Sequence, residues 1–249
     1  MISAPVDHSA PWTEQITVRW RPSLAFYEHR FLFLRELEKE SLLSGFRVKT
    51  DDAVDARIRG VDYEVSLSST GLVINAKIRG ADWEPIAFTI ALAIRVSEPA
   101  ELTAVEVDFS HLVRLEEEYD VMREQSAEAW FGPWSARAGI QDHATLIDGE
   151  TEHAKYQMEF GVIKRGEAKE RLERRSGRLE TKLSRFPHSW KDEDVPPVAI
   201  FVGSSWEALS VPEAEQETVA ESIATFRNTS NESVVQLIDE LQTSLASVE

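Results

Sequence analysis

The stretch that decides the fold class reads FRVKTDDAVDARIRGVDYEVSLSSTGLVINAKI and covers residues 46–78. Four strand-like runs follow one another in it, at 46–49, 54–59, 63–67 and 72–78. The tetrapeptide Ser68-Ser69-Thr70-Gly71 predicts a hairpin turn between the last two runs. Because successive strands joined by short turns pair in antiparallel fashion, and because helical patterns flank this stretch, the sequence predicts an α+β fold.

A strand and a helix are expected before this stretch. Residues 15–20 alternate Ile16, Val18 and Trp20 with polar residues, as in a strand with one buried face. Ser23 suits the N-cap of a helix that runs to about residue 43, and Gly45 suits the residue that ends it.

The stretch that follows is ambiguous. Residues 86–96 alternate like a strand, yet Asp82, Glu84 and Pro85 fit the start of a helix, and we favour a buried helix. A strand is then expected over 103–115.

The second part of the chain begins after a polar connection. Residues 156–163 predict a strand, 164–185 a basic helix, 198–202 a short strand, and 212–225 and 231–246 two acidic helices. We therefore predict two halves, each a mainly antiparallel sheet packed with one or two helices. They occupy residues 1–115 and 151–249, with a connecting seam at 116–150.

The composition of the chain limits the classes of partner that it can bind. The 249 residues carry 44 acidic against 27 basic side chains, a net charge of −17, which argues against nucleic acid and anionic membranes as partners. No cysteine is present, so disulfides, thiolate nucleophiles and cysteine-type metal sites are excluded. The N-terminus is unlike a signal peptide, and the longest apolar-rich run, 86–96, is shorter than a membrane span. We expect a cytoplasmic protein without membrane contact.

The order of elements resembles a known group. It combines ITVRWRP at 16–22, a long helix, a hairpin, DWEP at 82–85, VEVDFSHLVRL at 105–115, PPVAIFV at 196–202 and an acidic pair of terminal helices. This layout is similar to a sporadically distributed prokaryotic family of about 250 residues whose function is unassigned. The resemblance implies no catalytic residues. The sporadic distribution prompts the hypothesis of an accessory role in a defence or toxin-control locus, antiviral defence included.

Two groups of residues are candidates for binding. Trp130, Phe131 and Trp134, with Trp190, either form an exposed contact patch or pack in the core. A basic stripe recurs at helical spacing and includes Arg171, Arg174, Arg175 and Arg178. It could bind phosphate, be a solvated face with i,i+4 ion pairs, or dock against the acidic segment 191–249, within one chain or across a dimer.

An enzymatic alternative is a metal-dependent nuclease or phosphodiesterase. The triplet Glu167-Ala-Lys169, with Glu159 upstream, matches the residue types that hold Mg²⁺ and orient water. Its polar surroundings differ from the apolar strand on which such triplets normally lie. The acid and histidine residues at 142–159 could also supply metal ligands, but they match no established spacing. The acidic runs at 116–118 and 192–194 admit a third role, an acidic DNA mimic that inhibits a nucleic-acid-binding protein.

Motifs of other enzyme classes are missing. The sequence has no Gly-x-Ser-x-Gly, Gly-x-Gly-x-x-Gly or Walker loop, so we expect no nucleotide cofactor and assign no metal site. The expectation is a non-enzymatic protein that binds another protein or a second copy of itself as a homodimer. Trp130, Phe131 and Trp134 would supply contact area, and charged rims would set orientation.

Overall fold

The structure is a computed structural model of the chain. It describes residues 10–49, 52–59, 63–76, 83–132, 144–176, 190–213 and 216–247.

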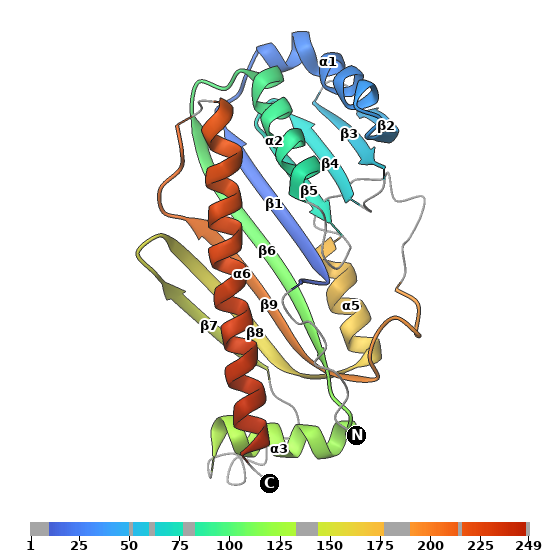
Figure 1. Cartoon of the computed structure of the whole chain (residues 1–249), viewed down its shortest axis with the longest axis vertical. Helices are drawn as coiled ribbons and strands as arrows, with labels where there is room; N and C mark the ends of the chain where they lie inside the picture. Colours follow the sequence, from blue (N-terminus) through green and yellow to red (C-terminus); the bar gives the residue numbers. More distant parts are fainter. Residues whose placement is uncertain are drawn as a thin grey trace.

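The described strands form a single nine-stranded antiparallel sheet in the order β2-β3-β4-β5-β1-β6-β9-β8-β7 (Figure 1). β1 and β6 pair at its centre, and β2 and β7 are its two edges. The strand bounds are β1 (Thr13–Trp20), β2 (Leu43–Lys49), β3 (Ala53–Ile58), β4 (Tyr63–Ser68), β5 (Gly71–Ala76), β6 (Leu102–Arg114), β7 (Thr145–Glu150), β8 (Ala154–Lys164) and β9 (Val198–Ala208).

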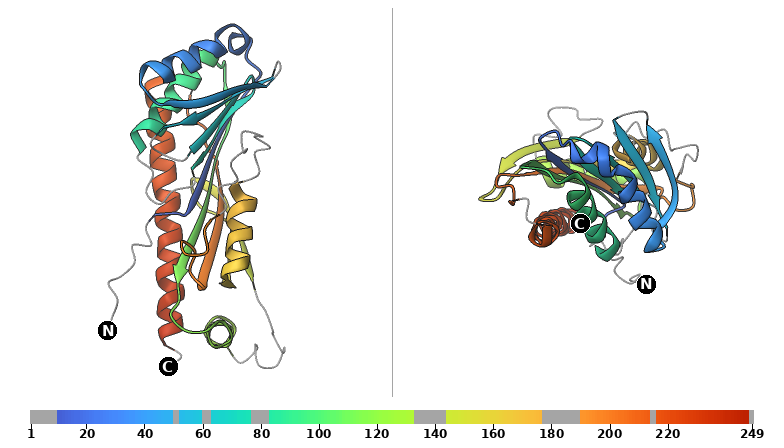
Figure 2. Two further views of the ribbon diagram at one scale, coloured as in Figure 1. Left: turned by 90° about the vertical axis from the view of Figure 1, so that its right-hand side faces the viewer. Right: turned by 90° about the horizontal axis from the view of Figure 1, so that it is seen from above.

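Helices cover both faces of this sheet. α1 (Ala25–Lys39), α2 (Trp83–Ser97) and α6 (Gln216–Ala246) lie on one face, and α5 (Arg165–Ser176) lies on the other (Figure 2). α3 (Tyr119–Phe131) crosses the end of the sheet, where it meets α6 and β8. Among the helices of the described ranges, none combines the length and the apolar composition of a membrane span.

Two hydrophobic cores follow from this arrangement. The larger core fills the layer between the sheet and α1, α2 and α6. The smaller one lies between α5 and the sheet, where Ala168 and Leu172 pack with Phe201 and Leu112. Alternation along the strands explains both, because successive side chains point to opposite faces of a sheet.

The predicted sheet in the first part of the chain is confirmed. β2 to β5 pair in succession as a meander, and the turn between Ser68 and Gly71 joins β4 to β5. Gly71 also lies against β1, because a Cβ at this position would be 2.6 Å from the carbonyl oxygen of Val18. The ambiguous run at 86–96 is helical, as favoured, and is part of α2.

The predicted ends of the first helix are wrong. Ser23 does not cap α1, since its hydroxyl donates instead to the Ser97 carbonyl at the end of α2. Gly45 does not end the helix and lies in β2. Ser41 takes the left-handed conformation with φ 58°. The Ser41 N–H bonds Glu38 and the Leu42 N–H bonds Leu37, which is the pattern of a Schellman motif.

The predicted break in the C-terminal helix is also wrong. α6 is continuous from Gln216 to Ala246, across residues 226–230 where the sequence predicts a gap. Arg227 and Ser230 face the sheet there, so tertiary contacts stabilise a stretch of low helix propensity. β9 is likewise longer than expected, because it pairs along its whole length with β8.

One sheet joins all the predicted regions of the chain. β6 belongs to the range 1–115, and it pairs with β1 of that range and with β9 of the range 151–249. The seam at 116–150 contributes α3 and β7, and α3 had no sequence prediction. The fold is therefore α+β, with a continuous antiparallel sheet.

Candidate functional site

Among the described residues, the largest group of exposed apolar side chains lies on α1 and β2, at one end of the sheet. Leu24, before the helix, is 81% exposed, Phe31 is 56% exposed, and Tyr27 lies between them. These positions are three and four residues apart, so they form one stripe along the outer flank of α1.

The neighbouring edge strand continues this apolar surface. Phe46 of β2 is 58% exposed, and Val48 is also exposed. Phe46 pairs with Ala56, which belongs to the larger core, so it lies on the face of the sheet that carries α1. Figure 1 shows α1 and β2 as neighbours. We call Leu24, Tyr27, Phe31, Phe46 and Val48 the α1–β2 surface.

The sequence carries a signal for this surface in its excess of apolar residues around α1. The helix has eight large apolar residues between Leu24 and Leu37, which is more than one buried stripe accommodates. Phe26, Phe33, Leu34 and Leu37 are buried, and Leu32 packs against the same core. Leu24, Tyr27 and Phe31 are left exposed.

Trp130 and Trp190, two residues of the predicted aromatic patch, pack against other aromatic rings. Trp130 is partly buried against the larger core and meets Phe160 edge to face, with ring centroids 5.4 Å apart. Phe131 ends α3, and Trp134 lies outside the described residues. Trp190 packs on Trp12 in the smaller core, with centroids 5.3 Å apart.

The basic helix α5 places Arg171 at the centre of an ion-pair cluster. Its guanidinium contacts Glu159 of β8 and, at 2.7 Å, Glu167 one turn earlier, and it lies over the Phe201 ring. Partial burial alone would lower the pKa of Arg171. The hydrogen bond to Glu167 and the charge of Glu159 outweigh that effect, so the pKa lies above its ordinary value.

Arg171 is the only residue of the basic stripe whose side chain the structure describes. The side chains of Arg174 and Arg175 lie outside the described part of the chain, as does Arg178. α5 and α6 are on opposite faces of the sheet, so Arg171 does not face the acidic helix of its own chain (Figure 2). Lys169 of α5 does pair with Asp192, which belongs to the acidic segment 191–249.

Three residues of the nuclease alternative are paired with other groups. Glu159 and Glu167 both contact Arg171, and Lys169 donates to Asp192 at 2.6 Å. Within the described ranges, no three acidic or histidine side chains are grouped to hold a metal ion. Asp142 and His143 of the histidine and acid group lie outside those ranges. The charges of Glu159, Glu167 and Lys169 are thus balanced by neighbouring side chains of opposite charge.

The contact between Lys169 and Asp192 gives a measurable prediction. The hydrogen bond from Lys169 lowers the pKa of the Asp192 carboxyl. We expect Lys169→Met to raise this pKa towards the ordinary aspartate value, as followed by an NMR titration of the carboxyl carbon. Because the pKa of Asp192 is lower in the folded than in the unfolded state, the ion pair stabilises the fold at pH values above the unfolded-state pKa. That contribution disappears as the pH falls through the folded-state pKa. An unchanged Asp192 titration in Lys169→Met would show that the ion pair does not form in solution.

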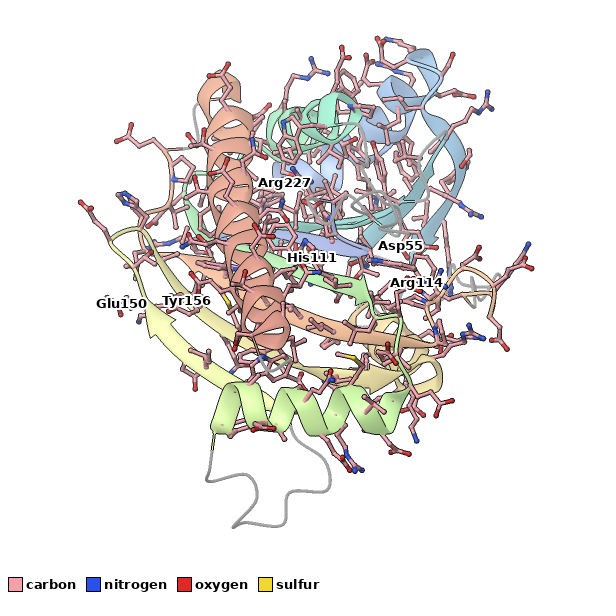
Figure 3. All side chains as sticks on the ribbon, turned by 60° about the horizontal axis from the view of Figure 1, so that its bottom comes forward. Asp55, His111, Arg114, Glu150, Tyr156 and Arg227 are labelled. Atoms are coloured by element: carbon pink, nitrogen blue, oxygen red, sulfur yellow. The ribbon has the colours of Figure 1, made fainter. Side chains whose placement is uncertain are left out.

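A buried polar group beneath α6 was not predicted. Arg227 binds the carboxylate of Glu14 on β1 with two nitrogens, one of them 2.7 Å from its oxygen. Glu14 is only 4% exposed, and the guanidinium also lies near the Trp83 ring of α2. His111 of β6 hydrogen-bonds Asn231, one helical turn after Arg227, at 3.1 Å. Figure 3 shows Arg227 and His111 between α6 and the sheet.

No family model matches this chain, and a search of curated proteins found no significant similarity. The resemblance in layout to a prokaryotic family therefore stays a prediction.

Proposed function

We propose that this protein acts by binding and associates with a second copy of itself through the α1–β2 surface. Five of the eight large apolar side chains that are well exposed in the described residues lie on or beside these two elements. Exposed apolar groups that gather in one region mark interaction sites more often than scattered ones do. This concentration is the observation that carries the proposal.

The edge position of β2 supports a second copy as the partner. No strand of the described residues pairs with its outer edge, so its backbone can accept a further strand. Two copies of β2 can pair in antiparallel fashion about a twofold axis perpendicular to the sheet. This axis keeps both α1 helices on the same face. Their apolar flanks would then meet across the joined edges and cover Phe31 and Phe46.

The proposal predicts a reversible dimer. We expect sedimentation velocity to show a species of twice the 28.2 kDa chain mass as concentration rises. The double variant Phe31→Ser/Phe46→Ser should weaken dimerisation by more than about tenfold, because truncating central apolar contacts commonly costs over 1 kcal/mol. Both side chains are exposed, so the monomer should remain folded.

The matched control is Leu146→Ser on β7, the other edge of the sheet. Leu146 is 59% exposed, and its loss should leave dimerisation unchanged. A protein that stays monomeric at all concentrations would refute self-association. Loss of the dimer in Trp130→Ala/Trp134→Ala, but not in Phe31→Ser/Phe46→Ser, would instead favour the aromatic patch predicted from the sequence.

Neither the metal-dependent nuclease nor the acidic DNA mimic is proposed as the function of this protein. The nuclease alternative needs Glu159 and Glu167 to bind a metal, and both face Arg171. No contact among the described residues specifically favours a DNA mimic. The cytoplasm remains the proposed location, which the cysteine-free composition supports.

The division into two halves is also a proposal. It is supported by the packing of α1 with α2 near β5 within the first range. α5 packs near β8 and β9 of the second range, and also against β1 and β6 of the first. If residues 1–115 and 151–249 are separate packing units within one sheet, a change that loosens the second should leave β2 to β5 protected. Hydrogen exchange in Phe201→Ala tests this expectation.

A further inference from the structure

A groove of about 580 Å³ lies beside α6, at the strand ends of β6, β8 and β9. Its lining includes Val105, Ala154 and Trp206 from the strands and Thr225, Phe226 and Ser233 from the helix. Arg227 lies near Trp83 of α2, and Thr225 is two positions earlier, about 200° around the helix. The groove therefore follows the flank of α6 that faces away from α2 (Figure 1).

Small side chains on this flank keep the groove open. Ser222, Thr225, Thr229 and Ser233 recur three and four positions apart and all line it. α2 covers the opposite flank, whereas no described helix covers this one. The volume lies in the range of small-molecule sites in proteins.

Trp206 lines the groove and carries an unpaired hydrogen-bond donor. The residue is 3% exposed, and its indole N–H has no acceptor among the described residues. Buried donors are nearly always paired, because an unpaired one loses its hydration without replacement. A ligand carbonyl would supply the acceptor after displacing the side chains that cover this nitrogen.

The helix hydroxyls complement this donor. Thr225 donates to the Glu221 carbonyl and Ser233 to the Thr229 carbonyl, each at 3.0 Å. Their hydrogens are engaged, so these oxygens are left to accept a bond from a ligand. Glu152 lies in the lining, and the chain carries a net charge of −17, which disfavours an anionic ligand.

We propose that this groove binds a small, neutral, largely apolar molecule that carries a carbonyl or amide group. The carbonyl accepts from Trp206, an amide N–H donates to a helix hydroxyl, and the apolar body covers Val105, Ala154 and Phe226. This site is separate from the α1–β2 surface and does not depend on self-association.

Nile red, a neutral apolar dye with a carbonyl oxygen, is a suitable probe. We expect saturable one-to-one binding with a blue-shifted emission, and a shift of the Trp206 indole resonance in ¹⁵N–¹H spectra. The missing peak in Trp206→Phe assigns this resonance. Trp206→Phe should weaken binding by about threefold to tenfold, the worth of one hydrogen bond. Thr225→Phe should weaken it by more than about tenfold because the ring fills the groove.

Thr243→Phe is the matched control on the same helix. Thr243 is also an exposed threonine whose hydroxyl donates to the carbonyl four residues earlier, but it does not line the groove. Its substitution should leave Nile red binding unchanged, as should Phe31→Ser/Phe46→Ser on the α1–β2 surface. Equal binding by Thr225→Phe and Thr243→Phe would overturn the proposal. So would a change in oligomeric mass in Thr225→Phe, because the groove would then be a protein interface.

Discussion

Arg227→Met is expected to lower the free energy of unfolding by about 3–5 kcal/mol, the usual cost of removing one partner of a buried ion pair. The carboxylate of Glu14 is 4% exposed and would lose both nitrogen donors of Arg227. The low exposure of this carboxylate limits the access of water that could replace these donors. Urea denaturation followed by circular dichroism measures the effect.

A double-mutant cycle separates the pair from its surroundings. Glu14→Leu/Arg227→Met removes both charges and keeps apolar volume, so most of the lost stability should return. Arg123→Met is a comparison on α3, because that arginine pairs with exposed carboxylates, and such pairs contribute about 0–1 kcal/mol. A loss below about 1 kcal/mol in Arg227→Met would show that water reaches the Glu14 carboxylate.

Phe201→Ala should cost a similar amount, about 3–5 kcal/mol, through the cavity that it leaves. Phe201 is 1% exposed in the smaller core, with Leu172 of α5 in the same cluster and Arg171 over its ring. The remaining members of this core are few, so α5 should lose much of its attachment to the sheet. Leu146→Ala on exposed β7 should change stability by less than about 0.5 kcal/mol.

Hydrogen exchange would show which elements lose stability in Phe201→Ala. We expect faster exchange in α5, β8 and β9, and little change in β2 to β5. Uniform acceleration across all nine strands would show that the sheet opens as one unit, and it would contradict the proposed division into halves.

Local patterns predicted most of the fold. Ile16, Val18 and Trp20 alternate and are buried in β1, and the meander follows the strand-like runs that predict it. These predictions hold because side-chain alternation and turn residues act over a few positions. The predictions were wrong where contacts between residues far apart in the sequence determine the local structure. Ser23 bonds the end of α2 rather than its own helix, and Arg227 and Ser230 stabilise α6 across a stretch expected to break.

The candidate sites depended more on tertiary structure. The sequence showed that Trp130 is a bulky aromatic residue, but not that Phe160 would pack on it. The sequence places Glu159 and Lys169 ten residues apart. It did not show that Glu159 would contact Arg171, or that Lys169 would contact Asp192. The α1–β2 surface was present in the sequence as an excess of apolar residues, and only the packing of α1 decided which of them are exposed.

The sequence by itself determined the α+β class, the succession of strands and the strongly acidic charge, because composition and short-range periodicity carry this information. The tertiary structure decided that the strands form one sheet, that α5 and α6 lie on opposite faces, and which charges pair. The physical reason is that burial and ion pairing depend on residues such as Glu14 and Arg227, far apart in the chain, whose contact exists only once the sheet and its helices have packed.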